Sequence, residues 1–120
     1  MWKILVTTEF ETWHQTLTDS EKIALSNVLA LLEHRGPVLG RPHVDRVESP
    51  RFHNMKEIRL SNGICVFFAF DPRRSAVLLI GGNKSESESS SPNWNRFYEQ
   101  MIPVADEIYA EHLLTLGDGK

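Results

Sequence analysis

A chain of 120 residues with a net charge of −3 is long enough for one domain with its own core, and its single cysteine excludes a disulfide framework. Its apolar runs fall well short of the roughly 20 residues that cross a bilayer. Residues 1–6 are too short for a secretory signal. We therefore expect a single domain over 1–120, in the cytoplasm and without a membrane partner.

The charges are unevenly distributed along the chain. Residues 41–84 hold eight Lys and Arg against four Asp and Glu, which gives +4, whereas residues 1–40 carry −2 and residues 85–120 carry −5. A local basic region matters more than net charge for binding phosphate groups. The middle of the chain is therefore the candidate surface for a polyanion.

The N-terminal part predicts a strand and two helices. Residues 2–6 are strand-like, and residues 8–11 fit a capping box before a short helix. A second capping box at 18–21 precedes a longer helix that Gly36 and Pro37 end. The apolar stripe of this longer helix is Leu25, Val28, Leu29 and Leu32. We expect the two helices to form a hairpin that covers one face of a sheet.

The middle part predicts strands. Residues 37–54 are mostly loop with a short strand near 44–47, and residues 55–60 alternate between apolar and polar. This alternation places Glu57 and Arg59 together on one face. Residues 64–70 and 76–80 are continuous apolar runs joined by a tight turn at 71–74, as in an antiparallel hairpin of central strands.

The C-terminal part predicts a linker and a helix. Residues 85–92 are rich in Ser and Glu, so we expect a mobile acidic linker. Apolar residues then recur at helical spacing from Trp94 to Ile108, and Pro103 should kink or split this helix. The predicted fold class is α+β: a small, mostly antiparallel sheet with an N-terminal helical hairpin on one face and a C-terminal helix. We expect the opposite face to be open.

The sequence has few signatures of metal or nucleotide chemistry. Its five histidines lack metal-ligand spacing, and it has neither a Walker-type glycine loop nor a Gly-x-Ser-x-Gly elbow. We therefore expect no metal and no cofactor.

The residue types that remain suit metal-free cleavage of RNA, which needs a base, cations that stabilise the phosphorane and an acid. Glu57 or His53 can be the base, Arg59 and Arg73 can stabilise charge, and Lys84 can anchor the phosphate or act as the acid. The alternative for each is structural: Glu57 and Arg59 form a surface ion pair, Lys84 is a solvated lysine, and His53 is a loop histidine.

Six motifs follow one another along the chain: LGRP at 39–42, MKEIR at 55–59, FFAFDPRR at 67–74, LLIGGNK at 78–84, WNRFY at 94–98 and IPVAD at 102–106. In this order they resemble the RelE/ParE toxin superfamily, in particular the HigB-like, phage-derived toxins of type II toxin-antitoxin systems. The resemblance implies a RelE-like fold, an antitoxin partner of the helix-turn-helix HigA-like type, and endoribonuclease cleavage of mRNA on the translating ribosome.

The same resemblance implies roles for particular residues. It assigns Lys56, Arg59, Arg73 and Lys84 to RNA contact and catalysis, with Glu57 in the same motif. We expect the catalytic residues to be Glu57, Arg59, Arg73 and Lys84, and the RNA-binding residues to be His53, Lys56, Arg74 and Tyr98. Tyr98 or Trp94 can stack on a base, although packing of the last helix is the favoured role of both aromatics.

Two departures from the family pattern bear on activity. Relatives usually carry an arginine just before the Val-Phe-Phe run, where this chain has Cys65, and the acidic linker near Lys84 is longer than usual. Cys65 leaves open a weakened or inactive relative that only binds its antitoxin. A ParE-type poison of DNA gyrase also stays open, because the same fold serves both kinds of toxin.

Overall fold

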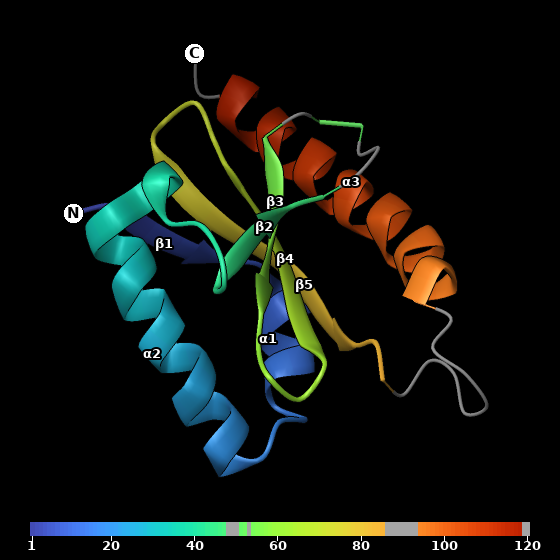
Figure 1. The fold of residues 1–120 in the computed structure, drawn as a ribbon. Helices are drawn as coiled ribbons and strands as arrows, with labels where there is room; N and C mark the ends of the chain where they lie inside the picture. The colour runs from blue at the N-terminus through green and yellow to red at the C-terminus, as the bar shows by residue number, and fades with distance from the viewer. Residues whose placement is uncertain (48–50, 53, 86–93, 119–120) are drawn as a thin grey trace.

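The computed structural model describes residues 1–47, 51–52, 54–85 and 94–118, which form five strands and three α-helices (Figure 1). In chain order these are β1 (Lys3–Val6), α1 (Thr8–His14), α2 (Asp19–Arg35), β2 (Val44–Arg46), β3 (Met55–Arg59), β4 (Ile64–Phe70), β5 (Ser75–Asn83) and α3 (Trp94–Asp118), with a short 3-10 turn at Gly36–Val38 after α2.

Helix capping explains where α1 and α2 begin. The capping box predicted for α2 is confirmed: Thr18 Oγ1 accepts from the Glu21 N–H at 3.2 Å, and Glu21 accepts from the Thr18 N–H at 2.8 Å. For α1 the predicted cap was one residue late, because Thr7 and not Thr8 accepts from the Phe10 N–H. The Thr7 hydroxyl also donates to the Leu79 carbonyl at 2.7 Å, which ties the cap to the sheet.

The strands form one sheet in the order β1-β5-β4-β3-β2. The neighbours β5, β4, β3 and β2 pair antiparallel, as the hairpin at 71–74 predicted, whereas β1 pairs parallel to β5. The antiparallel sheet and the flanking helices confirm the predicted α+β fold class.

Helices cover both faces of this sheet, so the expectation of an open face was wrong. One core lies against α1 and α2 and includes Phe10, Leu25, Ile58 and Phe68. The other lies against α3 and is formed by side chains that include Met55, Cys65, Phe67, Leu79, Phe97 and Tyr109. Figure 1 shows α3 on the opposite side of the sheet from α2. The central strands are apolar on both faces, and both faces therefore need a cover.

The last helix is not divided at Pro103. It runs from Trp94 to Asp118, with Pro103 inside it. The predicted linker lies outside the described residues apart from Ser85. In the part of the chain that the structure describes, no helix combines the length and apolar character that crossing a membrane requires.

Two consecutive glycines allow helices to approach β5 from both sides. A Cβ on Gly81 would lie 2.4 Å from the Trp13 ring of α1, and a Cβ on Gly82 would lie 3.0 Å from the Phe97 ring of α3. The backbone of β5 is thus in direct contact with aromatic rings on each face.

Gly81→Ala should lower the free energy of unfolding by about 1–3 kcal/mol, because the Trp13 ring would have to move out of a packed site. Urea unfolding followed by circular dichroism measures this. Gly40→Ala is the matched control, since no heavy atom lies within 4 Å of a Cβ built there. Equal unfolding free energies for the two variants would contradict the prediction.

Candidate functional site

Alternation along β3 positions the two charged residues that the sequence singled out. Glu57 and Arg59 share one face, as predicted, because Met55, Glu57 and Arg59 alternate with Lys56 and Ile58. That face was expected to be open, but α3 covers it. Glu57 lies between Asp45 of β2 and Phe67 of β4 in the sheet register. Glu57 is therefore a buried carboxylate in the middle of the sheet rather than a surface residue.

Arg59 lies between two carboxylates. Its Nη2 is 3.3 Å from Glu57 Oε2 and 3.3 Å from Asp45 Oδ2, and Asp45 also pairs with Arg41 at 3.1 Å. Partial burial opposes the charge of Arg59, but Glu57, Tyr98 and Asp45 outweigh this and raise its pKa. The Arg59 side chain is 41% exposed while that of Glu57 is 3% exposed, so Arg59 is the charge of this pair that a ligand can reach.

Tyr98 of α3 connects Glu57 to Lys84. Its hydroxyl donates to Glu57 Oε1 at 2.8 Å and accepts from Lys84 Nζ at 3.4 Å. Burial raises the pKa of Tyr98, and the neighbouring Cys65 and Glu57 raise it further, so the phenol keeps its proton and remains a donor. We name Asp45, Glu57, Arg59, Lys84 and Tyr98 the Glu57 cluster.

Cys65 lies directly beside this cluster. It is the cross-strand partner of Arg59 in the β3–β4 register, and its side chain is buried under α3. Burial raises the pKa of the Cys65 thiol to about 12, and the charge of Glu57 contributes to the rise. Cys65 is therefore a neutral thiol in the folded chain and supplies no charge to the cluster.

We expect iodoacetamide at about pH 8 to alkylate Cys65 at least roughly 100-fold more slowly in the folded chain than in denaturant, because the thiol must be uncovered before it can ionise. Mass spectrometry over time measures the rate. Similar rates with and without denaturant would mean that α3 does not stay in place over Cys65.

The other predicted site residues lie elsewhere. Lys56 points to the opposite face, where its Nζ donates to the Pro37 carbonyl at 3.1 Å and lies 5.7 Å from the centre of the Phe70 ring. Burial, together with Arg46, lowers the pKa of Lys56. His53 lies outside the described residues.

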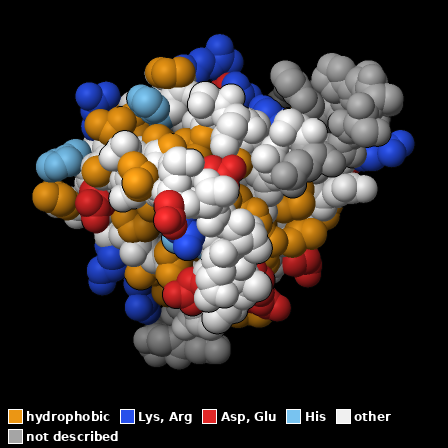
Figure 2. Space-filling view, turned by 90° about the horizontal axis from the view of Figure 1, so that it is seen from below, with side chains coloured by type: hydrophobic (Ala, Val, Ile, Leu, Met, Phe, Trp, Pro, Cys, Tyr) orange, Lys and Arg blue, Asp and Glu red, His pale blue; other side chains and the backbone are white. Residues whose placement is uncertain are grey.

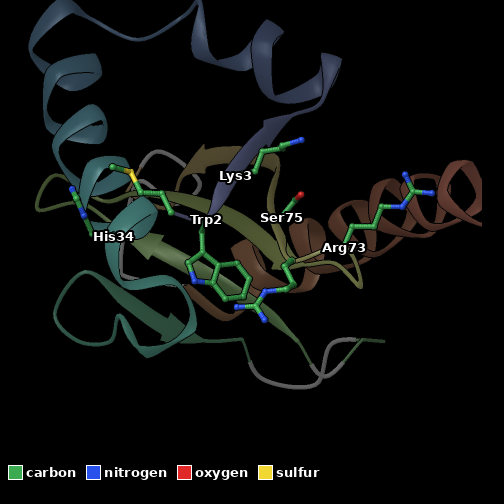
Figure 3. Close-up of a pocket in the computed structure, with 7 residues that line it drawn as sticks. Trp2, Lys3, His34, Arg73 and Ser75 are labelled. Carbon is green, nitrogen blue, oxygen red and sulfur yellow. The ribbon is translucent and has the colours of Figure 1, made fainter.

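Arg73 and Arg74 lie in the turn between β4 and β5, at the far end of the hairpin from Arg59 and Lys84. They line a pocket with Trp2 and Lys3 of the N-terminal segment and with His34 of α2 (Figure 3). The structure therefore separates Arg73 from the Glu57 cluster, and its position favours a binding role over the predicted catalytic one.

The side of the molecule seen in Figure 2 does not present one continuous basic face. Figure 2, which views the molecule from below, shows Lys and Arg mostly at the rim of that side, with apolar and acidic side chains between them. Among the described residues, no group of three or more His, Cys, Asp and Glu is placed to hold a metal ion. The chemistry that the Glu57 cluster offers is proton transfer and charge stabilisation.

Comparison with known proteins decides the family. Residues 12–110 match the family described as phage derived protein Gp49-like (DUF891). This chain belongs to that family.

Its relatives are described as toxins. Putative toxin HigB3 of Mycobacterium tuberculosis is 41% identical over 105 residues, which cover 87% of each protein. Putative toxin HigB2 of the same organism is 43% identical over 96 residues, which cover 77% of this chain and 45% of HigB2.

Among solved structures, the isolated E. coli RelE toxin superposes with a TM-score of 0.60 at 10% identity, covering 85% of this chain and 100% of RelE, so the two share a fold. With the Gp49-like match and the two HigB relatives, this confirms the resemblance to HigB-like members of the RelE/ParE superfamily.

One residue of the Glu57 cluster was not predicted from the sequence. Asp45 is the second carboxylate at Arg59, yet the segment around it was predicted only as a short strand. The sequence carried a weak signal for Asp45. If the short strand at 44–47 pairs with β3, Asp45 can lie directly across from Glu57 on the same face of the sheet.

Proposed function

We propose that this Gp49-like chain is the toxin of a type II toxin-antitoxin pair and a metal-free endoribonuclease that cleaves mRNA during translation. The observation that carries the proposal is Arg59, a partly exposed guanidinium held beside a buried carboxylate and directly across from Cys65. Cys65 occupies the position where the resemblance implies an arginine. Arg59 therefore supplies a guanidinium next to the one that is missing, which supports an active enzyme over an inactive relative.

The proposed reaction transfers the phosphate within the RNA. The ribose 2′-oxygen attacks the adjacent phosphorus, the bond from phosphorus to the 5′-oxygen breaks, and the products carry a 2′,3′-cyclic phosphate and a 5′-hydroxyl. Glu57 takes the 2′-hydroxyl proton, Arg59 and Lys84 stabilise the charge of the phosphorane, and Lys84 gives a proton to the leaving oxygen.

In the arrangement described above, both oxygens of Glu57 accept hydrogen bonds, from Tyr98 and from Arg59. Glu57 orients Arg59 in this state but cannot reach an RNA hydroxyl. The reaction therefore requires that the Tyr98 hydroxyl leave Glu57 when RNA binds, which exposes one carboxylate oxygen at the moment it is needed.

The relatives named HigB also support a neutralising antitoxin partner, for which a helix-turn-helix protein of the HigA type is the candidate. The proposed place of action is the cytoplasm, where ribosomes and mRNA are found.

The test is to incubate the purified chain with ribosomes that translate a defined mRNA and to map the ends of the fragments. Fragments with 2′,3′-cyclic phosphate and 5′-hydroxyl ends, absent when the antitoxin is added, are the expected result. Growth arrest with intact mRNA and a DNA-damage response would instead favour the gyrase-directed function.

A further inference from the structure

A pocket of about 390 Å³ opens at the end of the sheet opposite the Glu57 cluster. It lies where β1 begins, α2 ends and the β4–β5 turn crosses between them. Its lining residues are Met1, Trp2, Lys3, His34, Arg73, Arg74 and Ser75. Figure 3 shows Lys3 and Arg73 extending on one side of Trp2 and His34 lying on the other. We name this site the Trp2 pocket.

The Trp2 pocket gathers positive charge from two separate segments, the first strand and the β4–β5 turn. Lys3, Arg73 and Arg74 are all exposed and cationic, His34 adds an imidazole, and its described lining includes no Asp or Glu. The nearest buried carboxylate belongs to Asp71, and it is occupied by His112 and by backbone N–H groups. The pocket therefore offers donors to an anion without a competing acid in its wall.

Arg74 has an unusual backbone conformation, and its side chain lies over an aromatic ring. Its φ is 64°, a conformation that favours glycine, and its guanidinium lies 4.8 Å from the centre of the Trp2 ring. Trp2 is itself tightly packed. Its ring lies edge-on to the Phe70 ring, with 5.1 Å between the ring centres, and a Cβ on Gly36 would lie 2.2 Å from Trp2 Nε1. The guanidinium is thus preorganised, which reduces the entropy lost on binding a ligand.

We propose that the Trp2 pocket binds phosphate groups of RNA as a second contact, apart from the Glu57 cluster. The inference rests on the proposed function for the choice of RNA as ligand. Planar guanidinium groups suit phosphate oxygens, and the Trp2 ring holds one of them, Arg74, in position. The pocket and the level of Arg59 are about 23 Å apart along β5, since seven residues at roughly 3.3 Å each separate Ser75 from Gly82.

The test uses a double variant, Lys3→Ala with Arg74→Gly. Glycine suits the φ of 64° at this position, so a loss of binding cannot be ascribed to backbone strain. The control is Lys22→Ala, which removes one cation at the opposite end of α2. The probe is a single-stranded 2′-O-methyl RNA, which lacks the attacking hydroxyl and cannot be cleaved.

The dissociation constant is measured over a range of salt concentrations. If two phosphate contacts are lost, the slope of log K against log salt should shrink by about 1.4, at roughly 0.7 per contact on a single strand. The Lys22→Ala slope should equal that of the parent. A second arm measures binding to purified ribosomes. Weaker binding to the free RNA assigns the phosphates to the message, and weaker binding to ribosomes alone assigns them to ribosomal RNA.

The outcomes separate this inference from the proposed function. A parent chain that binds the probe through Lys3 and Arg74 but cleaves no mRNA supports the pocket and refutes the nuclease. A chain that cleaves mRNA while the double variant binds RNA and ribosomes like the parent refutes the pocket. Weakened binding to the acidic face of an antitoxin, with RNA and ribosome binding unchanged, would also overturn the inference.

Discussion

Arg59→Ala should lower the rate of mRNA cleavage by about 100-fold or more, which is the usual result of removing one donor that stabilises transition-state charge. The loss of cleavage rate should lie at the upper end of this range, because the neighbouring Cys65 offers no cation that could substitute for the lost guanidinium. Single-turnover cleavage of a translated mRNA measures the rate. Growth arrest on induction gives an independent measure in cells.

Two further variants test whether the loss of activity is specific to the Arg59 guanidinium. Arg59→Lys retains the charge but not the planar fork, so it should cleave at a rate between those of the parent and Arg59→Ala. Arg46→Ala is the matched control, because Arg46 is exposed on neighbouring β2 and pairs in register with Lys56 on the other side of the sheet. A thermal unfolding scan of each variant shows whether the fold is retained. If Arg59→Ala cleaves as fast as the parent, the assignment of Arg59 is wrong.

Asp71→Ala should lower the free energy of unfolding by about 3 kcal/mol, the largest effect on stability that we expect from a single substitution. The Asp71 side chain is completely buried; Oδ1 accepts from the Arg73 and Ser75 N–H groups at 2.9 Å each, and Oδ2 is 2.8 Å from His112 Nε2. Alanine would leave two backbone donors unpaired and detach the end of α3 from the β4–β5 turn.

The Asp71 carboxyl group also makes the free energy of unfolding depend on pH in acid. Burial opposes ionisation of Asp71, but the hydrogen bonds from His112, Ser75 and Arg73 outweigh it and hold its pKa below 3.8. A carboxyl group whose pKa is depressed by folding stabilises the native state above its unfolded value, and this stabilisation is lost as pH falls through the folded value. The parent should therefore lose stability below about pH 3.8 more steeply than Asp71→Ala.

Urea unfolding at neutral and acid pH measures both effects. Asp71→Asn should be intermediate, because the amide oxygen can still accept from the turn. Asp19→Ala is the control: Asp19 is an exposed residue in the first turn of α2, where a carboxylate contributes about 0.3–1 kcal/mol. A loss for Asp71→Ala no larger than that of the control would contradict the role given to Asp71.

Local patterns in the sequence predicted most of the elements. The run at 64–70 matches the bounds of β4, and Thr18 and Gly36 mark the ends of α2. The covered second face was not predicted, although the same run carries the reason. A strand that is apolar at every position has two faces to bury, and the helical hairpin can cover only one of them.

The candidate site was predicted only as far as a single strand allows. Period-two alternation was enough to put Glu57 and Arg59 on one face. The hairpin predicted at 71–74 already places the turn and Lys84 at opposite ends, so the separation of Arg73 from Lys84 follows from the sequence prediction itself. Tyr98 reaches Glu57 through the docking of α3, a contact across 41 residues that no local pattern encodes.

The parallel pairing of β1 with β5 also sets an order on the formation of the fold during synthesis. The first strand, Lys3–Val6, pairs with residues 75–78, so it emerges long before its partner exists. Pairings of such long range are slow to form and come late. Helix α3 is made last of all, and Glu57 and Arg59 therefore stay uncovered until it docks. A nascent chain thus exposes the Glu57 and Arg59 side chains to solvent until α3 docks over them.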